Sequence, residues 1–193
     1  MKSIEANKLD PNFKYEITHQ MGGEKMMQCF ACGTCSASCL IREIDEQYNP
    51  RRIIRMALLG MRKEVLESDL IWLCAGCQLC SERCPQDVRL PEVIHAIRGI
   101  AIKDAEKGKI RLASPNALFA KVFIDSIKAH GRIWEPELMG KFFMGKKDIA
   151  GMIGYAPLGI EMVKHGKLPF LPHRIKGLKK IREIFRKSNT LAI

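Results

Sequence analysis

The sequence lacks a long apolar run. Its longest candidate, residues 149–160, is interrupted by Gly151, Gly154 and Pro157, and it is shorter than the ~20 residues that span a bilayer. The first ten residues, MKSIEANKLD, lack the apolar segment of a secretory signal. We therefore expect no transmembrane segment and a cytoplasmic location, where the reducing environment keeps thiols free.

Several enzymatic motifs are also absent. No GxGxxG motif follows a predicted strand and no phosphate-binding loop occurs, so the sequence carries no nucleotide-binding fingerprint. Asp87 and His95 are the candidates for acid–base chemistry, but neither has a recognisable partner constellation in the sequence. We therefore predict that this chain has no catalytic residue of its own.

Cysteine is instead concentrated in two runs of identical spacing. The first run is Cys29, Cys32, Cys35 and Cys39, and the second is Cys74, Cys77, Cys80 and Cys84, followed by Pro85. This CxxCxxCxxxC pattern is the ligand spacing of proteins that hold two [4Fe–4S] clusters, in which each iron takes one thiolate. Because such clusters mostly carry electrons, the sequence predicts two [4Fe–4S] clusters and a function in electron transfer.

The fourth ligand of each cluster is expected to come from the other run, as it does in two-cluster ferredoxins. On that basis one cluster takes Cys29, Cys32, Cys35 and Cys84, and the other takes Cys74, Cys77, Cys80 and Cys39. Small residues between the ligands would let backbone N–H groups approach the cluster sulfur atoms. Trp72, just before the second run, is expected to shield a cluster from water.

Zinc and disulfide bonds are the alternatives for these cysteines. Zinc commonly uses two CxxC pairs, so the third and fourth cysteines of each run would be redundant for one tetrahedral ion. The dense spacing favours metal binding over disulfide bonds. None of the five histidines lies inside either run, so a histidine ligand is not expected.

The chain is strongly basic, with a formal net charge of +11. A [4Fe–4S] cluster with four thiolate ligands is anionic, so bound clusters would offset part of this charge. The remaining positive charge could face an acidic protein partner or nucleic acid. For an electron relay we expect the acidic protein partner and no nucleic acid.

Helix signals follow each cysteine run. Asn49 suits an N-cap and Pro50 suits the first helical position, and the apolar face of the predicted helix continues to Val65. A second helix begins at Leu90-Pro91 and ends near Gly108. These two helices and the two ligand loops form a pseudo-repeat.

The cysteine-free remainder is also expected to be mainly helical. Ser114-Pro115 begins a helix that ends before Gly131, residues 135–144 form a short helix, and a segment with glycine and proline follows. Residues 173–187, which include Arg174, are basic and amphipathic and predict a last helix. A solvated surface helix, a docking helix for a partner subunit, and a helix that binds a membrane surface or nucleic acid are the alternatives for it.

These features predict a mainly α protein in three parts. The parts are an N-terminal extended segment over residues 1–28, a two-cluster α-helical ferredoxin-like domain over 29–108, and a helical C-terminal extension for subunit docking over 109–193. The 34 residues between Cys39 and Cys74 leave room for a helix. In this respect the pattern resembles the α-helical ferredoxin fold of the iron–sulfur subunits of succinate dehydrogenases and related enzymes.

The sequence further resembles the C subunit of heterodisulfide reductase. The resemblance rests on the two cysteine runs, the helical spacer, the Trp72-Leu73-Cys74 approach to the second run, and a tail with Leu168-Pro169 and residues 172–177, PHRIKG. It implies a non-catalytic subunit of an oxidoreductase complex. That subunit passes electrons through two [4Fe–4S] clusters from a flavin- and cluster-containing A subunit to a catalytic B subunit with CCG motifs.

In methanogenic archaea the B subunit of this family reduces the mixed disulfide of coenzyme M and coenzyme B. The resemblance also implies a larger assembly that includes a hydrogenase or a formate dehydrogenase. One departure is visible, since Leu40 follows Cys39 where a proline often stands. Proline fixes the backbone after the crossing ligand, so its absence should loosen that corner without removing a ligand.

Two other functions compete with this one. A relay subunit of another modular oxidoreductase, such as a glycolate or glycerol-3-phosphate dehydrogenase, would share the two cysteine runs. Many of those relatives fuse the ferredoxin module to a CCG module, which this chain lacks. A zinc-stabilised nucleic-acid-binding protein is suggested by the basic tail, and its affinity for nucleic acid would fall steeply with salt.

Overall fold

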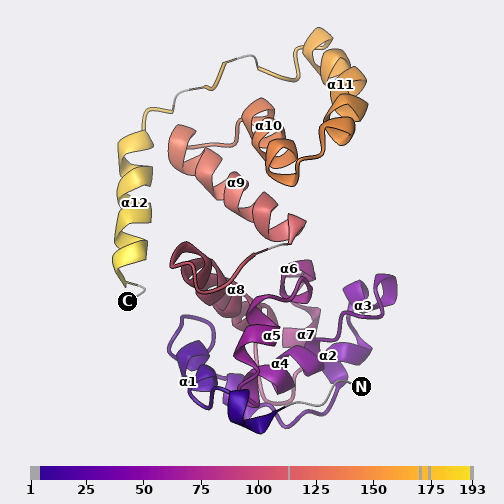
Figure 1. The fold of residues 1–193 in the computed structure, drawn as a ribbon, viewed down its shortest axis with the longest axis vertical. Coiled ribbons are helices and arrows are strands. Elements are labelled where there is room, and N and C mark those ends of the chain that lie inside the picture. The colour runs from indigo at the N-terminus through magenta and orange to yellow at the C-terminus, as the bar shows by residue number, and fades with distance from the viewer. Residues whose placement is uncertain (1–4, 113, 170, 174, 192–193) are drawn as a thin grey trace. The chain divides into compact units, whose positions relative to one another are not determined.

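The computed structural model describes residues 5–112, 114–169, 171–173 and 175–191, and all regular elements in these ranges are helical (Figure 1). The first part of the chain contains η1 (Ala6–Lys8), α1 (Phe13–Thr18), η2 (Met26–Gln28), α2 (Thr34–Ala37), α3 (Leu40–Ile44), α4 (Pro50–Leu58), α5 (Arg62–Leu66), α6 (Leu70–Leu73), α7 (Leu79–Glu82) and α8 (Leu90–Glu106). The second part contains α9 (Pro115–His130), α10 (Glu135–Lys146), α11 (Ile149–Lys164) and α12 (Leu178–Leu191). The prediction of a mainly α fold is confirmed.

The chain divides into two compact units, residues 1–114 and 115–193. The division falls six residues after the boundary expected at 108/109, and the first unit includes residues 1–28 as well as both cysteine runs. The assignment of residues 29–108 as the cluster-binding domain and of 109–193 as a docking extension stays a prediction. Each unit is described by itself.

Helix α8 supplies much of the core of the first unit. It begins where Pro91 stands in the first turn and ends before Gly108, whose φ of 70° suits the residue that follows a helix. Its fully buried side chains include Val93, Ile94 and Ile97. Burial of each such side chain contributes about 1.5–3 kcal/mol, so this stripe anchors the surrounding short helices.

The helix predicted from Asn49 to Val65 is two helices. Its start is confirmed, because the Asn49 side chain accepts a hydrogen bond from the Arg52 backbone N–H at 3.1 Å. The break falls at Gly60, which has a φ of 78° and accepts the Asp10 backbone N–H at 2.8 Å. The prediction of one continuous apolar face was therefore wrong, since a left-handed glycine against Asp10 ends α4 and lets α5 turn away.

The N-terminal segment is not extended, and that prediction was wrong. Helix α1 and the two 3₁₀ helices occupy much of it, and Phe13, Ile17 and Met26 are fully buried in the core of the first unit. Phe13 and Ile17 lie four residues apart, so they share one face of a helix. Tertiary burial of this face stabilises a helix of six residues that would be marginal in isolation.

Arg62 ties three segments of the first unit together. Its guanidinium contacts both carboxylate oxygens of Glu16 at 2.9 Å and Asp104 Oδ2 at 2.5 Å, and it lies 5.4 Å from the centre of the Phe13 ring. The Asp104 side chain is only 6% exposed. The arginine therefore neutralises a nearly buried carboxylate on α8 while it holds α1 against α5.

In the second unit, helices α9 and α10 pack together through aromatic and polar contacts. The Phe119 and Phe142 rings meet edge to face with centroids 5.7 Å apart. The Trp134 backbone N–H donates to the Ser126 hydroxyl at 3.1 Å, and the Trp134 indole donates to the Pro169 carbonyl at 3.1 Å. The starts predicted for both helices are confirmed at Pro115 and Glu135.

Helix α11 was not predicted, because its glycines and Pro157 were interpreted as breakers. The Asp148 side chain caps it by accepting the Gly151 backbone N–H at 2.8 Å, and Pro157 lies inside the helix. None of its residues is buried. Among the described residues, no helix is long and apolar enough to cross a membrane.

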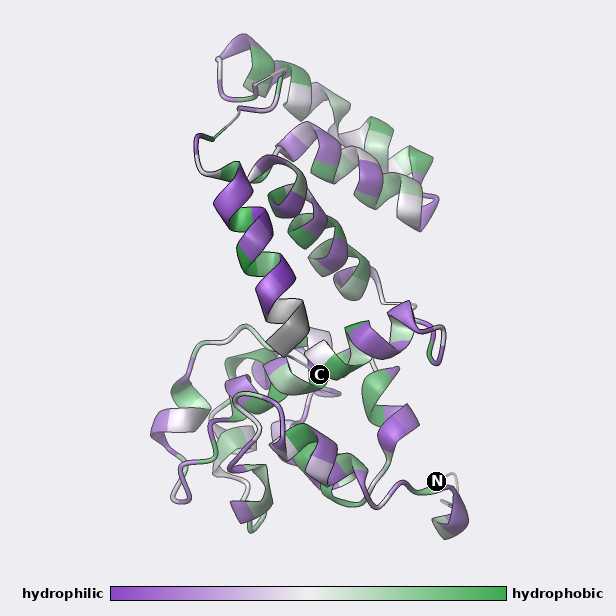
Figure 2. Cartoon of the chain, turned by 90° about the vertical axis from the view of Figure 1, so that its left-hand side faces the viewer, coloured by the Kyte–Doolittle hydropathy of each residue, from purple (hydrophilic) through white to green (hydrophobic). Residues whose placement is uncertain are grey.

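The basic C-terminal helix begins at Leu178, so the expected start at residue 173 was wrong; Arg174 lies outside the described residues. Gly177 precedes the helix, and Ile175 lies against Gly131, where it leaves no room for a Cβ atom. Arg182 donates to the carbonyls of Lys128 and Ala129 at the end of α9. Hydrophilic and hydrophobic residues alternate along residues 178–187 of α12, a pattern typical of an amphipathic helix (Figure 2).

Candidate metal centre

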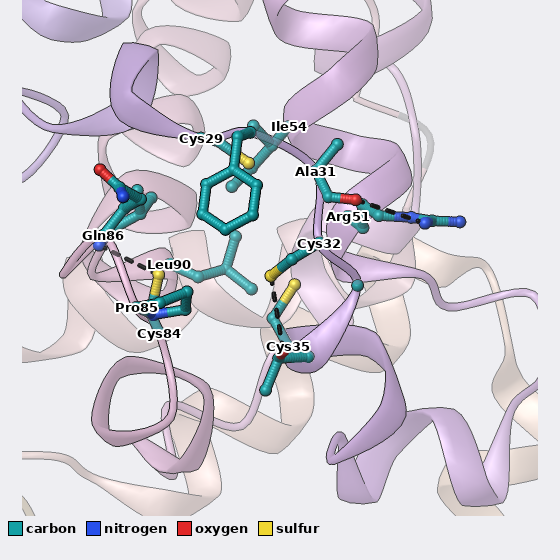
Figure 3. Close-up of a pocket in the computed structure, with 14 residues that line it drawn as sticks. Cys29, Ala31, Cys32, Cys35, Arg51, Ile54, Cys84, Pro85, Gln86 and Leu90 are labelled. Atoms are coloured by element: carbon teal, nitrogen blue, oxygen red, sulfur yellow. Dashed lines mark hydrogen bonds between the residues drawn. The ribbon is translucent and has the colours of Figure 1, made fainter.

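One cavity of the first unit brings together cysteines from both runs. Cys29, Cys32, Cys35 and Cys84 line it, and apolar side chains such as Phe30, Ile54 and Leu90 complete its wall (Figure 3). Cys84 belongs to the second run, yet it lies beside the first three cysteines of the first run. These are the four side chains that the crossed arrangement assigns to one cluster, although their role as ligands stays a prediction.

The two ligand loops repeat the same backbone conformation. Ala31 and Gly76, each two residues after the first cysteine of its run, have φ of 61° and 67°. Gly33 and Gln78, two residues further on, have φ of 89° and 63°. Alternating left-handed residues wind each loop tightly, so that successive backbone N–H groups can point inward as an anion-binding nest.

A short helix follows each loop at the same position. Helix α2 begins at Thr34 and α7 begins at Leu79, in each case one residue before the third cysteine of the run. The second cysteine of each run, Cys32 and Cys77, is exposed, whereas the other six are partly buried. Each loop therefore presents one cysteine to the surface and turns the rest toward the interior.

Hydrogen bonds reach two sulfur atoms of the cavity. The Val88 backbone N–H donates to Cys84 Sγ at 3.3 Å, and the Thr34 hydroxyl lies 3.4 Å from Cys32 Sγ. The Thr34 hydroxyl lowers the pKa of the Cys32 thiol, while burial raises the pKa of Cys35. A backbone donor such as the Val88 N–H stabilises a thiolate, which is the form that binds metal.

The second set of cysteines gathers around Tyr48. This side chain is 1% exposed, and burial raises the pKa of its hydroxyl, with further increases from the neighbouring Cys74, Cys39 and Cys80. Burial also raises the pKa of Cys80 to about 12, with contributions from the charges of Cys74 and Cys35. Three of the four cysteines assigned to the second cluster thus lie near one buried hydroxyl, and Cys80 lies near both sets.

Arg98 and Trp72 border the second set. Arg98 Nε donates to the Ile71 carbonyl at 2.7 Å, and its Nη2 donates to the Cys74 carbonyl at 3.0 Å. The guanidinium carbon lies 5.6 Å from the centre of the Trp72 ring. Trp72 is partly buried and packs against the core, but its indole Nε1 is buried without a hydrogen-bond partner among the described residues.

The residues fit a cofactor that is larger than a single ion. Within the described part of the chain, no three cysteine, histidine or acidic side chains converge on one point as the ligands of a single metal ion do. Four cysteines instead surround a cavity, and a [4Fe–4S] cube requires this because each thiolate binds a different iron. When bound, such a cluster supplies reversible one-electron chemistry.

The two candidates for acid–base chemistry, Asp87 and His95, do not line the cysteine cavity. Asp87 forms an exposed ion pair with Lys25, which lowers the pKa of the carboxyl group. His95 is an exposed residue of α8. Sequence reasoning missed Tyr48 and Arg98, although Arg98 could have been noticed as a charge beside the apolar stripe of Ile94 and Ile97.

Comparison with known families supports the cluster chemistry. The profile of the 4Fe-4S dicluster domain matches residues 25–88, which include all eight cysteines. The second iron–sulfur C subunit of the CoB–CoM heterodisulfide reductase of Methanocaldococcus jannaschii is 35% identical over 155 residues, which cover 76% of this chain and 80% of that protein. The chain belongs to the family of heterodisulfide reductase C subunits.

Other members of this family match over shorter lengths. The C2 subunit of the H(2)/formate:CoB-CoM heterodisulfide,ferredoxin reductase of Methanococcus maripaludis is 41% identical over 124 residues, or 62% of this chain and 64% of that protein. The C subunit of the H(2):CoB-CoM heterodisulfide,ferredoxin reductase of Methanothermobacter thermautotrophicus is 35% identical over 100 residues, or 52% of this chain and 53% of that protein. The chain therefore spans less than two thirds of the length of these two relatives.

Proposed function

We propose that this chain is the electron-transfer subunit of a heterodisulfide reductase complex and that it binds two [4Fe–4S] clusters. One cluster is held by Cys29, Cys32, Cys35 and Cys84, and the other by Cys74, Cys77, Cys80 and Cys39. The observation that carries the proposal is the cavity in which Cys84 joins the first three cysteines of the other run. Membership of the heterodisulfide reductase family supports the same function.

The protein contributes positions, insulation and hydrogen bonds to this relay. The left-handed residues wind each loop tightly, which would turn backbone donors toward a bound cluster, and buried neighbours such as Ile54 and Leu90 exclude water from one side of the first cavity. Exposed Cys32 and Cys77 bring one edge of each site to the surface. Partner subunits can approach these edges to deliver and to remove electrons.

The partners follow from the family. Electrons would come from a flavin- and cluster-containing A subunit and pass to a catalytic B subunit that reduces the coenzyme M–coenzyme B heterodisulfide, as part of methanogenesis in the cytoplasm. A hydrogenase or a formate dehydrogenase would complete the larger assembly. The net charge of +11 suits acidic partner surfaces, and the chain itself needs no catalytic residue.

Anaerobic purification from the native source tests this function. We expect about eight iron and eight sulfide per chain, as two cubes require, together with flavin and CCG-containing subunits. Zinc without sulfide would overturn the cluster assignment. Intact clusters with co-purifying glycolate- or glycerol-3-phosphate-oxidising subunits would instead assign the chain to another modular oxidoreductase.

A further inference from the structure

Arg98 holds a fixed position beside the first ligand of the second run. Two of its guanidinium nitrogens donate to the backbone carbonyls of Ile71 and Cys74, at 2.7 Å and 3.0 Å. The Trp72 ring lies against the guanidinium, with its centre 5.6 Å from the central carbon. Because a planar guanidinium with two hydrogen bonds and a stacked ring has little freedom, its charge stays next to Cys74.

This cation lacks a carboxylate partner among the described residues. Burial lowers the pKa of Arg98, and the groups that oppose this effect are Cys74 and Tyr48. The two carbonyl acceptors offset part of the cost of burying this cation, and an anion beside it would offset more. The anion that suits this position is one bound by Cys74 itself, and a [4Fe–4S] cluster with four thiolate ligands is such an anion.

Tyr48, which lies between the two cysteine runs in the sequence, adds a hydrogen-bond donor. Its ring is almost completely buried in the core against which Cys39, Cys74 and Cys80 pack, and burial together with these cysteines raises the pKa of its hydroxyl. A phenol next to a thiolate sulfur donates a hydrogen bond to the sulfur and withdraws negative charge from it.

The cavity of the first run has no equivalent partly buried cation among the residues that line it. The cation among its lining residues is Arg51, whose Nη1 lies 3.5 Å from the Ala31 carbonyl, but this side chain is exposed. Water and salt screen an exposed charge, whereas a charge at the protein interior acts through a lower dielectric constant. The two sites therefore differ in their electrostatic surroundings despite the repeated backbone.

We propose that Arg98 and Tyr48 raise the reduction potential of the cluster held by the second run, and that they do so as positioning residues rather than ligands. Reduction adds one electron and hence one negative charge to the cluster. A fixed cation and a hydrogen-bond donor stabilise the reduced form more than the oxidised form, so the potential rises. This inference rests on the proposed two-cluster relay and specifies how one of its two sites is tuned.

The test is an anaerobic redox titration of the full chain with both clusters reconstituted, followed by electron paramagnetic resonance. Arg98→Gln should lower the equilibrium constant for reduction of the second-run cluster at least tenfold. For one electron this is a fall of about 59 mV in the reduction potential. Tyr48→Phe should lower the same potential by less. Arg98→Lys, which keeps the charge but not the planar fork, should restore part of the loss.

Iron and sulfide content must be measured on every sample, because it separates two kinds of failure. A wild-type chain without two clusters would overturn the proposed function itself. Two intact clusters in Arg98→Gln with both potentials unchanged would overturn only the role of Arg98. Arg55→Gln, which removes an exposed charge of α4, is the matched control and should leave the second-run potential unchanged; a shift equal to that of Arg98→Gln would mean that net charge alone is responsible.

Discussion

Cys32 and Cys84 belong to different ligand runs but line one cavity. If both side chains bind the same cluster, replacing both cysteines should lose one cluster, the same loss as replacing either one alone. We expect the Cys32→Ser/Cys84→Ser variant to keep about four of eight iron, and the Cys32→Ser/Cys39→Ser variant to keep almost none. Iron and sulfide analysis after anaerobic reconstitution measures this directly. Uncrossed ligation predicts the reverse order, with the Cys32/Cys39 pair being the milder change.

The ligand loops also make a prediction about glycine. Gly76 has a φ of 67° with open space around its missing Cβ, so Gly76→Ala should cost only about 1–2 kcal/mol for a left-handed alanine, the conformation that Ala31 already adopts. Gly23→Ala should be far worse, because its Cβ would lie 1.9 Å from the Ile17 carbonyl oxygen. Thermal denaturation of both holo variants should show Gly23→Ala as the less stable, and equal midpoints would contradict this.

Arg62 should be important for the stability of the first unit. Arg62→Met would leave the nearly buried Asp104 carboxylate without its partner and would release Glu16, so we expect a loss of about 2–3 kcal/mol. Arg55→Met removes an exposed arginine from α4 and should stay within about 0.5 kcal/mol of the wild type. Denaturation followed by circular dichroism compares them. Equal effects would show that the ion-pair network contributes nothing beyond surface charge.

Glu137 should make the second unit sensitive to acid. Hydrogen bonds from Lys141 at 2.5 Å and His130 at 2.7 Å lower the pKa of its carboxyl group below the usual 4.5. A lowered pKa in the folded state contributes stability that is present above the unfolded pKa and is lost as pH falls through the folded pKa. Glu137→Gln should therefore reduce stability near neutral pH and flatten its decline below about pH 4.5.

The fluorescence of Trp134 in a Trp72→Phe background reports on this unit, which contains no cysteine and hence no cluster ligand. Glu161→Gln, which changes an exposed glutamate of α11, is the control and should keep the wild-type slope. If the stability of the wild type and of Glu137→Gln falls equally steeply as the pH is lowered, other carboxylates determine the acid sensitivity of this unit.

Local signals predicted much of the fold. Asn49-Pro50, Leu90-Pro91 and Pro115 each mark a helix start because caps and first-turn prolines act within a few residues. The features that were not predicted depend instead on contacts between residues that are distant in the sequence. Helix α1 depends on burial of Phe13 and Ile17 by distant segments, and the break at Gly60 depends on a contact with Asp10. Such contacts leave no trace in a local pattern.

The candidate site also has a part that the sequence predicted and a part that it did not. Cysteine spacing predicted that three cysteines of each run share one cluster, because a cube restricts the loop that wraps it, and the crossed fourth ligand was predicted by analogy with two-cluster ferredoxins. It could not predict Tyr48 or Arg98, since their approach to Cys74 is produced by the packing of α8 and of the loop before α4. Helix α11 was missed because Asp148 caps a segment whose composition favours a break.

The position of Cys84 in the first cavity has a consequence for biosynthesis. The ribosome makes residues 29–35 well before residue 84, so the first three side chains of this cavity must wait for the fourth. With the crossed ligation proposed above, neither cluster could be completed on a nascent chain that stops before the second run. On this proposal, cofactor insertion is coupled to synthesis through Cys84, and a chain truncated before that residue would lack the fourth ligand of the first cluster.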